Sequence, residues 1–192
     1  MYLQTSEGTT IAGGRWTAPA SSADDRVLAR ARGPVLDIGC GPGRHVRALV
    51  ERGVVTLGID LTPQLVATAQ AGGLDVLHRC VFGPVPAAGR WRCALLLDGN
   101  VGIGGDPVAL LRRIGELVTP DGQVLVETAG PDTSAVTVTA HIDLDGQRGP
   151  TFAWQTLGMS TLAMAAPAAG MVVSEAWSDE GRWFALLDRR AA

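Results

Sequence analysis

The sequence predicts an α/β fold in which an open, mostly parallel sheet carries helices on both faces. Short apolar runs alternate with segments of helical pattern from Val35 onward. A glycine-rich turn separates the first apolar run from the first of these helices. This alternating order is typical of parallel strands joined by crossover helices.

Each element is expected from a local pattern. The first 20 residues are rich in Gly, Ser, Thr and Pro and show no periodicity, which predicts an irregular arm. Ser22 is expected to cap a short helix that ends near Arg32. A capping side chain followed by proline begins two later helices, at Thr62 and Asp106. In chain order, the patterns predict a helix over 43–52, a strand over 54–60, helices over 63–71 and 107–118 with a strand over 92–98 between them, and a turn and strand over 119–129.

The C-terminal third has a different pattern. Residues 136–144 alternate apolar and polar side chains, which predicts a half-exposed antiparallel strand. A helix is expected near 159–169, and segments 171–177 and 182–188 predict a hairpin, turning at SDEG, that closes the sheet edge. We expect an N-terminal arm with its cap helix over 1–33 and a single domain over 34–192.

Composition excludes several classes of function. The 192 residues fit one domain, and their 46% hydrophobic content is enough for a packed core. All 16 basic residues are arginine, so lysine chemistry is excluded, and their scatter in a chain of net charge −3 argues against nucleic-acid binding. The three cysteines form no C-x-x-C pair, so we expect neither disulfides nor a metal site. With no long apolar run and no signal-peptide pattern, we expect a cytoplasmic protein that does not bind membranes.

The stretch VLDIGCGPGRH places Gly39, Cys40, Gly41, Pro42 and Gly43 directly after the first strand. Glycines at such a turn let a ligand approach the backbone and the free N–H groups of the next helix. A plain tight turn is the alternative, but it explains one glycine better than three.

Asp60 ends the second strand, where a carboxylate can accept hydrogen bonds from both ribose hydroxyls of a nucleoside. The alternative is a helix cap or a solvated acid. The dinucleotide fingerprint needs a third glycine where Arg44 stands, and Asp37 beside the loop would repel a pyrophosphate. Asp37 would instead suit an ammonium group. A nucleoside that carries an amino acid is S-adenosylmethionine.

At these residues the chain resembles the class I S-adenosylmethionine-dependent methyltransferases. The matching segments occur in the family's order over about residues 35–128: VLDIGCGPGR, GIDLT, LLLDGN and LVTPDGQVLVE. The resemblance implies a Rossmann-like, doubly wound, seven-stranded sheet in three αβα layers, mostly parallel and with an antiparallel C-terminal hairpin. It also implies that Gly39, Gly41 and Gly43 line the methionine and ribose side of the cofactor. Asp37 would lie near the ammonium, and Asp60 with Leu61 would contact ribose and adenine.

Two parts of the cofactor site depart from this pattern or stay open. The family usually places an acid after the third strand to bind the adenine amino group, but here Cys80 and Val81 occupy that position. We expect adenine contacts at Val81, with backbone groups or Asp75 supplying the polar contact. Arg44 and His45 are expected to contact the cofactor's carboxylate, with a helix-surface role as the alternative.

Fewer sequence features indicate where the methyl acceptor binds. Asp98, Asn100 and four glycines follow the strand whose end faces the methyl group in the resembling family, so we expect Asp98 near the cofactor and both residues near the transferred methyl. Turn-forming hydrogen bonds are the alternative for both residues. His141, and next His78, are candidate bases, unless they are solvated. The aromatic and apolar residues that either wall an acceptor pocket or pack the final hairpin are Trp16, Phe152, Trp154, Met159, Trp177 and Trp183.

The sequence therefore predicts an S-adenosylmethionine-dependent methyltransferase that acts on an O or N atom of a small organic metabolite, as a monomer or homodimer. One rival is a protein of the same fold that binds the cofactor without transferring methyl. The second rival is a nicotinamide-dependent oxidoreductase, which the acid beside the loop and the scarcity of hydride-site residues disfavour.

Overall fold

The structure, a computed structural model, describes residues 1–190, apart from the side chains of residues 11 and 12. Its central sheet has seven strands in the order β10-β11-β7-β6-β3-β4-β5. These strands are β3 (Val35–Ile38), β4 (Thr56–Asp60), β5 (Val76–His78), β6 (Trp91–Leu96), β7 (Val118–Thr128), β10 (Met171–Asp179) and β11 (Arg182–Arg189). β3 to β7 pair in parallel, and β11 is antiparallel to both its neighbours, so the predicted fold class and closing hairpin are confirmed.

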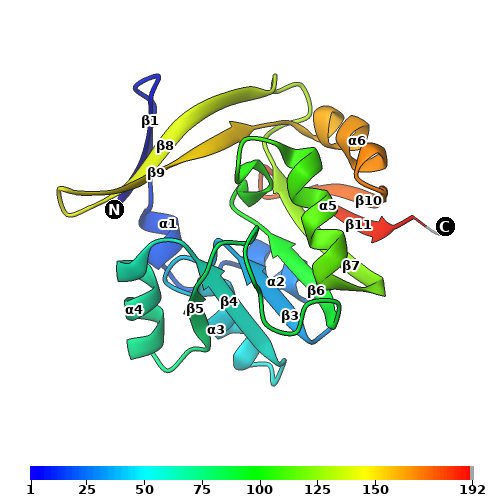
Figure 1. Cartoon of the computed structure of the whole chain (residues 1–192), viewed down its shortest axis with the longest axis horizontal. Helices are drawn as coiled ribbons and strands as arrows, with labels where there is room; N and C mark the ends of the chain where they lie inside the picture. Colours follow the sequence, from blue (N-terminus) through cyan, green and yellow to red (C-terminus); the bar gives the residue numbers. More distant parts are fainter. Residues whose placement is uncertain (191–192) are drawn as a thin grey trace.

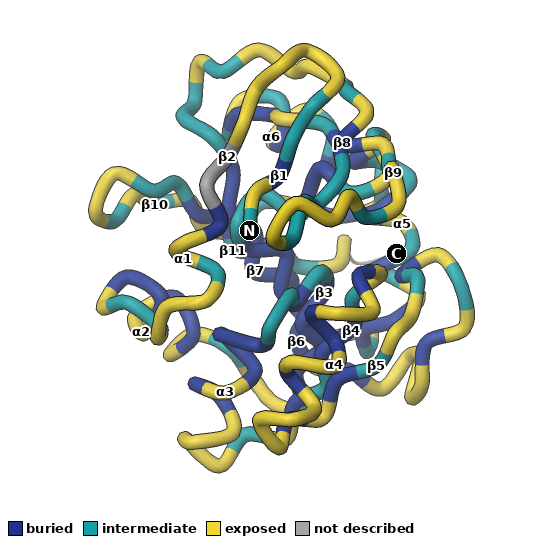
Figure 2. Tube along the Cα trace, turned by 90° about the vertical axis from the view of Figure 1, so that its left-hand side faces the viewer, coloured by how far each residue is buried: buried dark blue, intermediate teal, exposed yellow. Residues whose placement is uncertain are grey.

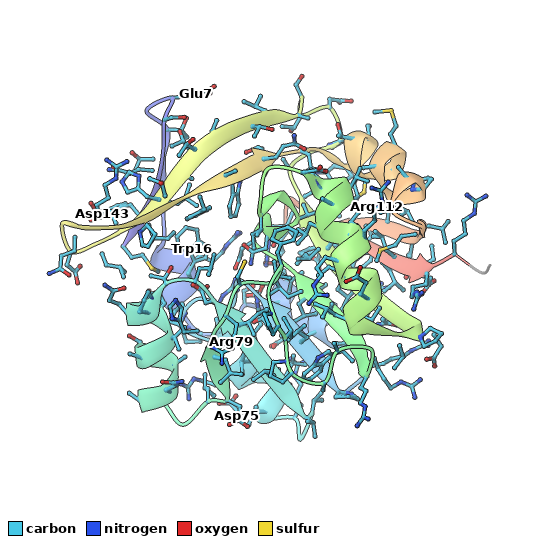
Figure 3. All side chains as sticks on the ribbon, in the orientation of Figure 1. Glu7, Trp16, Asp75, Arg79, Arg112 and Asp143 are labelled. Atoms are coloured by element: carbon cyan, nitrogen blue, oxygen red, sulfur yellow. The ribbon has the colours of Figure 1, made fainter. Side chains whose placement is uncertain are left out.

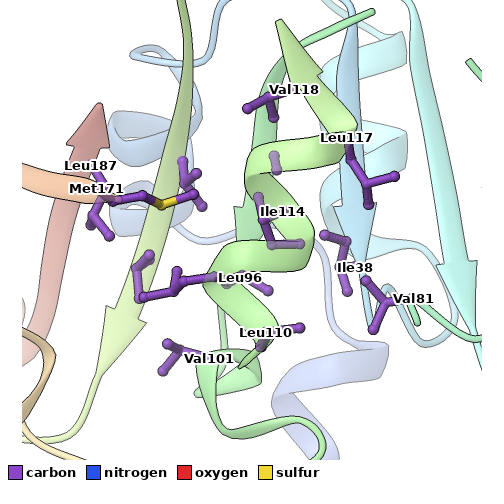
Figure 4. Close-up of a cluster of buried hydrophobic side chains, with 14 of the residues drawn as sticks. Ile38, Val81, Leu96, Val101, Leu110, Ile114, Leu117, Val118, Met171 and Leu187 are labelled. Carbon is purple, nitrogen blue, oxygen red and sulfur yellow. The ribbon is translucent and has the colours of Figure 1, made fainter. Parts of the chain in front are cut away.

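Helices cover both faces of this sheet, as Figure 1 shows. They are α1 (Gly14–Thr17), α2 (Ser22–Leu28), α3 (Arg44–Val50), α4 (Pro63–Ala71), α5 (Pro107–Leu117) and α6 (Met159–Ala168), with a short 3-10 turn η1 (Asn100–Gly102). On one face, α5 and α6 pack on Leu36, Leu96 and Val126, as the close-up of this core shows for Leu96 (Figure 4). On the other face, α2 and α3 pack on alternate residues of the same strands, including Val35 and Leu95. The result is the predicted three-layer arrangement.

A second sheet lies beside the first and was not predicted as such. Its four strands run in the order β2-β1-β8-β9 and are β1 (Tyr2–Thr5), β2 (Thr10–Ala12), β8 (Val136–Leu144) and β9 (Gln147–Thr156). Figure 1 shows it arching over one end of the central sheet, and in Figure 2 much of its outer side is exposed. The half-exposed antiparallel strand over 136–144 is confirmed, but it pairs with β1 and β9 and not with the central sheet.

The prediction of an irregular N-terminal arm is wrong. Its residues form β1, β2 and α1, because Leu3 and its neighbours find a hydrogen-bonding partner in β8, more than 130 residues away. β9 was also missed, since Gly149 and Pro150 interrupt its pattern. The signal that would have found it is the Asp145-Gly146 turn, both residues at positive φ, after an alternating strand.

Smaller differences concern element ends. The cap of α2 is Ser21, not Ser22: its side chain accepts from the Asp24 N–H while Asp24 binds the Ser21 N–H, which is a capping box. That helix ends at Leu28, four residues earlier than expected. The remaining predicted helices and strands agree within two or three residues with the structure. None of the helices in residues 1–190 is long and apolar enough to cross a membrane.

Candidate active site

A cavity opens at the carboxyl ends of β3, β4 and β6. The chain runs from β3 outward to β5 and then returns to place β6 on the other side of β3, so this is where the strand order reverses. Ligands of open α/β sheets bind at such a switch point. The cavity lies between this edge and the second sheet, and both contribute side chains to its wall.

The predicted glycine loop lines the cavity between β3 and α3. Gly39 and Gly43 have φ of 69° and 89°, values that other residues rarely adopt. A Cβ on Gly43 would lie 2.5 Å from Leu74, and one on Gly39 would lie 2.7 Å from the Asn100 amide nitrogen. The loop therefore has glycines at these two positions partly because neighbouring side chains leave no room for a Cβ. Gly41 lines the cavity and has room around it.

Asp60 lies where it was expected, at the end of β4 and in the cavity wall. One carboxylate oxygen accepts the Gly41 N–H at 2.9 Å, and the other accepts the Thr62 N–H at 2.7 Å. These bonds tie the glycine loop to β4. A carboxylate has about four acceptor positions, so Asp60 keeps capacity for the hydroxyl groups of a ligand. Leu61 beside it is half-exposed and lines the same cavity.

Asp37 is buried in β3, behind the glycine loop, and does not itself line the cavity. Its Oδ2 has no hydrogen-bond partner, and the ring nitrogen Nδ1 of His45 lies 3.9 Å away. Burial raises the pKa of Asp37 to about 6, against the opposing effect of His45. A buried carboxylate oxygen without a partner is costly, so this position is suited to a cationic or hydrogen-bonding ligand group.

Asn100 acts on the backbone of the loop. Its side-chain amide donates to the carbonyl oxygens of Ile38 at 2.8 Å and Gly39 at 3.0 Å, and the residue also lines the cavity. Asn100 therefore fixes the shape of the glycine loop from the end of β6. Its amide nitrogen is engaged by loop backbone, and its expected place near the transferred methyl stays a prediction.

A buried ionic network lies behind the cavity. Arg44 of α3 binds Asp24 of α2 through one terminal nitrogen and Asp98 through the other, at 2.6 Å to Asp98. Arg182 of β11 binds Asp24 at 2.7 Å and Glu127 of β7 at 2.7 Å. Burial would raise the pKa of Asp24, but the nearby His45 ring, hydrogen bonds from Ser21 and Arg182 and the charge of Arg44 hold it well below its usual range. The network joins α2, α3, β7 and β11 behind the cavity.

Arg44, His45 and Asp98 line the cavity; Arg44 and Asp98 are already hydrogen-bonded to each other, while His45 only approaches Asp24 and Asp37, at 3.4 and 3.9 Å. Asp98 accepts from Arg15 at 2.9 Å as well as from Arg44, and its N–H donates to Glu127. The Arg44 Nε is buried without a partner, while both terminal nitrogens are occupied. Arg44 was expected to offer a free guanidinium group to the carboxylate of a ligand. The structure differs, because both terminal nitrogens of Arg44 are already bound to acids.

The adenine side of the prediction is partly corrected. Cys80, Val81 and Phe82 line the cavity, as expected for Val81. Asp75 does not, because it is exposed at the start of β5 while the cavity lies at the strand's other end. In Figure 3 Asp75 lies at the lower edge of the molecule, away from Trp16. The polar contact expected from Asp75 is not available in this fold.

The second sheet supplies the apolar side of the cavity. Trp16, Phe152 and Trp154 all line it, as one of the two sequence interpretations expected. Leu3 and Ile142 join them and were missed, since their place depends on pairing between β1 and β8. The residues expected here that lie elsewhere are Trp177, which stacks on Phe184 in the hairpin, Trp183, which pairs in the same hairpin, and Met159, which packs on the main core.

The glycine-rich loop after β6 has a packing role that the sequence did not reveal. A Cβ on Gly102 would lie 1.9 Å from the Gln155 carbonyl oxygen of β9. Beside it, Ile103 forms an isolated bridge with Trp154, and the Gly104 N–H donates to the Ala153 carbonyl at 3.0 Å. This loop has a glycine at position 102 because β9 lies directly against it. The contacts between the loop and β9 hold the second sheet over the cavity.

Neither candidate histidine base lines the cavity. His141 lies on β8 between Gln4 and Thr151, on the face opposite to Ile142. His78 contacts the Leu61 carbonyl at 3.1 Å from outside the cavity wall. Within residues 1–190 no group of three His, Cys, Asp or Glu side chains is placed to hold a metal ion.

Comparisons with known proteins agree with this geometry. Over 122 residues the chain is 30% identical to a ubiquinone biosynthesis O-methyltransferase of Pseudomonas entomophila, which covers 58% of this chain and 50% of that protein. A homologue from Stutzerimonas stutzeri is 28% identical over 121 residues, with the same coverage. The chain thus spans about half the length of the curated relatives it matches.

Solved structures share the fold. A SAM-dependent methyltransferase from Bacteroides fragilis, solved with S-adenosyl-L-homocysteine, has a TM-score of 0.82 at 22% identity, covering 99% of this chain and 87% of that one. The 1,6-didemethyltoxoflavin-N1-methyltransferase of Burkholderia thailandensis has a TM-score of 0.68 at 20% identity, covering 93% and 82%. A family model described as a methyltransferase domain matches residues 18–175. The chain therefore belongs to the methyltransferase domain family.

Proposed function

We propose that this chain is an S-adenosylmethionine-dependent methyltransferase that transfers the methyl group to an O or N atom of a small organic molecule. The observation that carries the proposal is the cavity at the switch point, with a glycine loop on β3 and an acid at the end of β4. The relatives with named reactions include an O-methyltransferase and an N-methyltransferase, which supports both acceptor atoms.

The residues in and behind the cavity wall fit this cofactor. Asp37 lies behind the wall, and its unpartnered buried oxygen suits the ammonium of the methionine part, directly or through a water molecule. Asp60 has acceptor capacity for the ribose hydroxyls, and Leu61 with Val81 offers apolar contact to the adenine ring. When bound, the cofactor supplies a methyl group on a positively charged sulfur.

The chain's own task is to align the acceptor and exclude water, because methyl transfer is an in-line displacement. Asn100 keeps the glycine loop in shape, and the second sheet covers the acceptor side with apolar side chains. Asp98 lines the cavity and is held by Arg15 and Arg44, which supports an electrostatic role more than proton removal.

The rivals make different predictions for ligand binding. We expect calorimetric titration of the purified protein to show micromolar binding of S-adenosylmethionine and S-adenosylhomocysteine and no binding of NAD. Tighter binding of NAD would favour an oxidoreductase. Cofactor binding without product from any acceptor would favour the protein that binds and does not transfer methyl.

Asp60→Ala tests the ribose assignment in the same assay. The variant loses an acceptor for two buried hydroxyls, so we expect binding to weaken by about 1–3 kcal/mol. Glu51→Ala, an exposed acid at the end of α3, is the matched control and should bind as the parent does. Unchanged affinity in Asp60→Ala would show that Asp60 does not hold the ribose.

A further inference from the structure

The part of the cavity that faces the second sheet has three aromatic walls. Trp16 comes from α1, and Phe152 and Trp154 come from β9. The rings of Phe152 and Trp154 lie 6.1 Å apart and are tilted by 57°, so they do not stack face to face on each other. Figure 3 shows Trp16 under the arch of β8 and β9. Such rings favour a flat aromatic ligand, which gains stacked and edge contacts that a saturated ligand lacks.

The acids that line this cavity are already engaged by donors of the protein. Each oxygen of Asp98 accepts from an arginine, Arg15 or Arg44. Each oxygen of Asp60 accepts from a backbone N–H. Neither carboxylate therefore has an oxygen that is free of protein donors and directed at the proton of an acceptor.

The other ionisable groups of the lining are no better placed as bases. Both ring nitrogens of His45 face carboxylates, with Nε2 3.4 Å from Asp24 and Nδ1 3.9 Å from Asp37. The remaining groups are the permanently charged Arg79 and the thiols of Cys40 and Cys80, which are hydrogen-bond donors; burial raises the pKa of the Cys40 thiol. Among the described lining residues, therefore, no side chain is set to deprotonate an acceptor.

A cavity without a base is suited to an acceptor that does not have to lose a proton. A neutral ring nitrogen has a lone pair in the ring plane and no proton to lose. As its bond to the methyl carbon forms, the carbon–sulfur bond breaks and its electron pair stays on sulfur. The positive charge passes from sulfur to the ring, and no proton is released. Aromatic faces such as those of Trp16 and Trp154 stabilise a cation beside them.

We propose that the acceptor is a flat aromatic compound methylated on an uncharged ring nitrogen, held between Trp16 and the Phe152–Trp154 pair. This inference rests on the proposed function and narrows its acceptor from any O or N atom to one class.

The test compares acceptors of one shape with the full chain and S-adenosylmethionine at pH 7.5. Quinoline and isoquinoline carry a ring nitrogen, 2-naphthol has the same outline but must lose a proton, and decahydroisoquinoline is saturated. Product is measured by mass spectrometry. We expect kcat/KM for at least one ring nitrogen compound to exceed that of 2-naphthol and of decahydroisoquinoline by tenfold or more.

Variants test where the ring binds. We expect Trp154→Leu and Trp16→Leu to raise KM for the ring nitrogen compound roughly threefold to tenfold, the range of an aromatic contact. Cofactor affinity should stay within about twofold of the parent. Trp177→Leu is the matched control, because that ring stacks on Phe184 outside the cavity and should leave KM unchanged.

Each outcome has one meaning. Equal or faster methylation of 2-naphthol or decahydroisoquinoline overturns the inference, as does an unchanged KM in both tryptophan variants. Bound cofactor with no product from either ring nitrogen compound also overturns it and leaves the proposed function standing. A protein that binds no S-adenosylmethionine fails the proposed function itself, which the titration shows separately.

Discussion

The two sides of the cavity are built in different ways. The side at the edge of the central sheet is a short continuous loop after β3 and an acid at the end of β4, joined by a hydrogen bond from the Gly41 N–H to Asp60. The side at the second sheet consists of apolar residues from β1, α1, β8 and β9, which meet only through strand pairing. We propose that the first side, called the cofactor side below, binds a cofactor with fixed polar groups. We propose that the second, called the acceptor side, binds an acceptor recognised by shape.

The ionic network is the physical link between these two sides. Arg44 belongs to the helix that follows the glycine loop, and its partner Asp98 also binds Arg15 next to Trp16. A substitution in the ionic network should therefore affect both sides of the cavity, whereas a substitution within one side should affect only that side. The predictions below test this separation, from the largest effect to the smallest.

Arg44→Met should cause the largest loss. It removes the Arg44 partner of both Asp24 and Asp98 and leaves only Arg182 on Asp24 and Arg15 on Asp98; breaking a buried ion pair from one side costs about 3–5 kcal/mol in similar cases. The measurement is the free energy of unfolding from denaturant titration. Arg47→Met, an exposed arginine on the same helix, is the control and should change little. A loss below about 1 kcal/mol would mean that the network does not join the two sides.

Asp37→Asn should remove a pH-dependent loss of stability that the buried Asp37 carboxylate causes in the parent protein. Its folded pKa of about 6 lies above the ordinary value of 3.8, so parent stability falls as pH rises through that interval and the loss is complete above it. The variant lacks this loss, so its stability relative to the parent should rise from pH 4 to pH 7, by up to about 3 kcal/mol. Cofactor affinity should fall.

The check on Asp37→Asn is unfolding of both proteins at pH 4, 5.5 and 7, with the exposed Asp75→Asn as control. A stability difference that is the same at all three pH values would contradict the assignment of this titration to Asp37.

Gly102→Ala should damage the acceptor side selectively. The added Cβ would overlap the Gln155 carbonyl, so β9 must move, and such overpacking costs about 1–3 kcal/mol. For a chain of this size, that is a fall in Tm of roughly 2–4 °C per kcal/mol. Acceptor KM should rise more than the cofactor Kd. Gly14→Ala, with open space around it, is the control, and equal effects on both ligands would break the separation of the two sides.

Arg15→Gln should have the smallest effect on stability. Its side chain is 47% exposed, so its ion pairs with Asp98 and Glu127 are worth less than about 1 kcal/mol. We expect Tm to change by no more than a few degrees, because Leu3 and Trp16 hold the N-terminal segment through apolar contacts. Release of this segment in hydrogen exchange would show instead that the ion pairs hold it in place.

The cofactor side could be predicted from the sequence to a large extent. The positions of the glycine loop, Asp37 and Asp60 follow from motifs of a few residues, and the loop, Asp60, Leu61 and Val81 all line one cavity. The partners of those residues could not be predicted. Arg44 was expected to be free, yet it binds acids 20 and 54 residues away in the chain.

The acceptor side was predicted only as a possible gathering of aromatic residues. Trp16 and Trp154 are far apart in the chain, and nothing near either residue indicates that β1 pairs with β8. The bare loop after β6 suggested flexibility or closeness to a ligand, whereas its glycines make room for β9.

The sequence by itself determined the α/β fold, the order of its helices and strands, and the cofactor loop, because hydrophobic periodicity, caps and turns act between near neighbours. The tertiary structure alone decided the second sheet, the ionic network and the apolar acceptor wall. Those features depend on strand register and on charges that meet across more than 50 residues of chain, as in the Arg15–Asp98 and Arg182–Asp24 pairs. Only packing of the whole chain selects such partners.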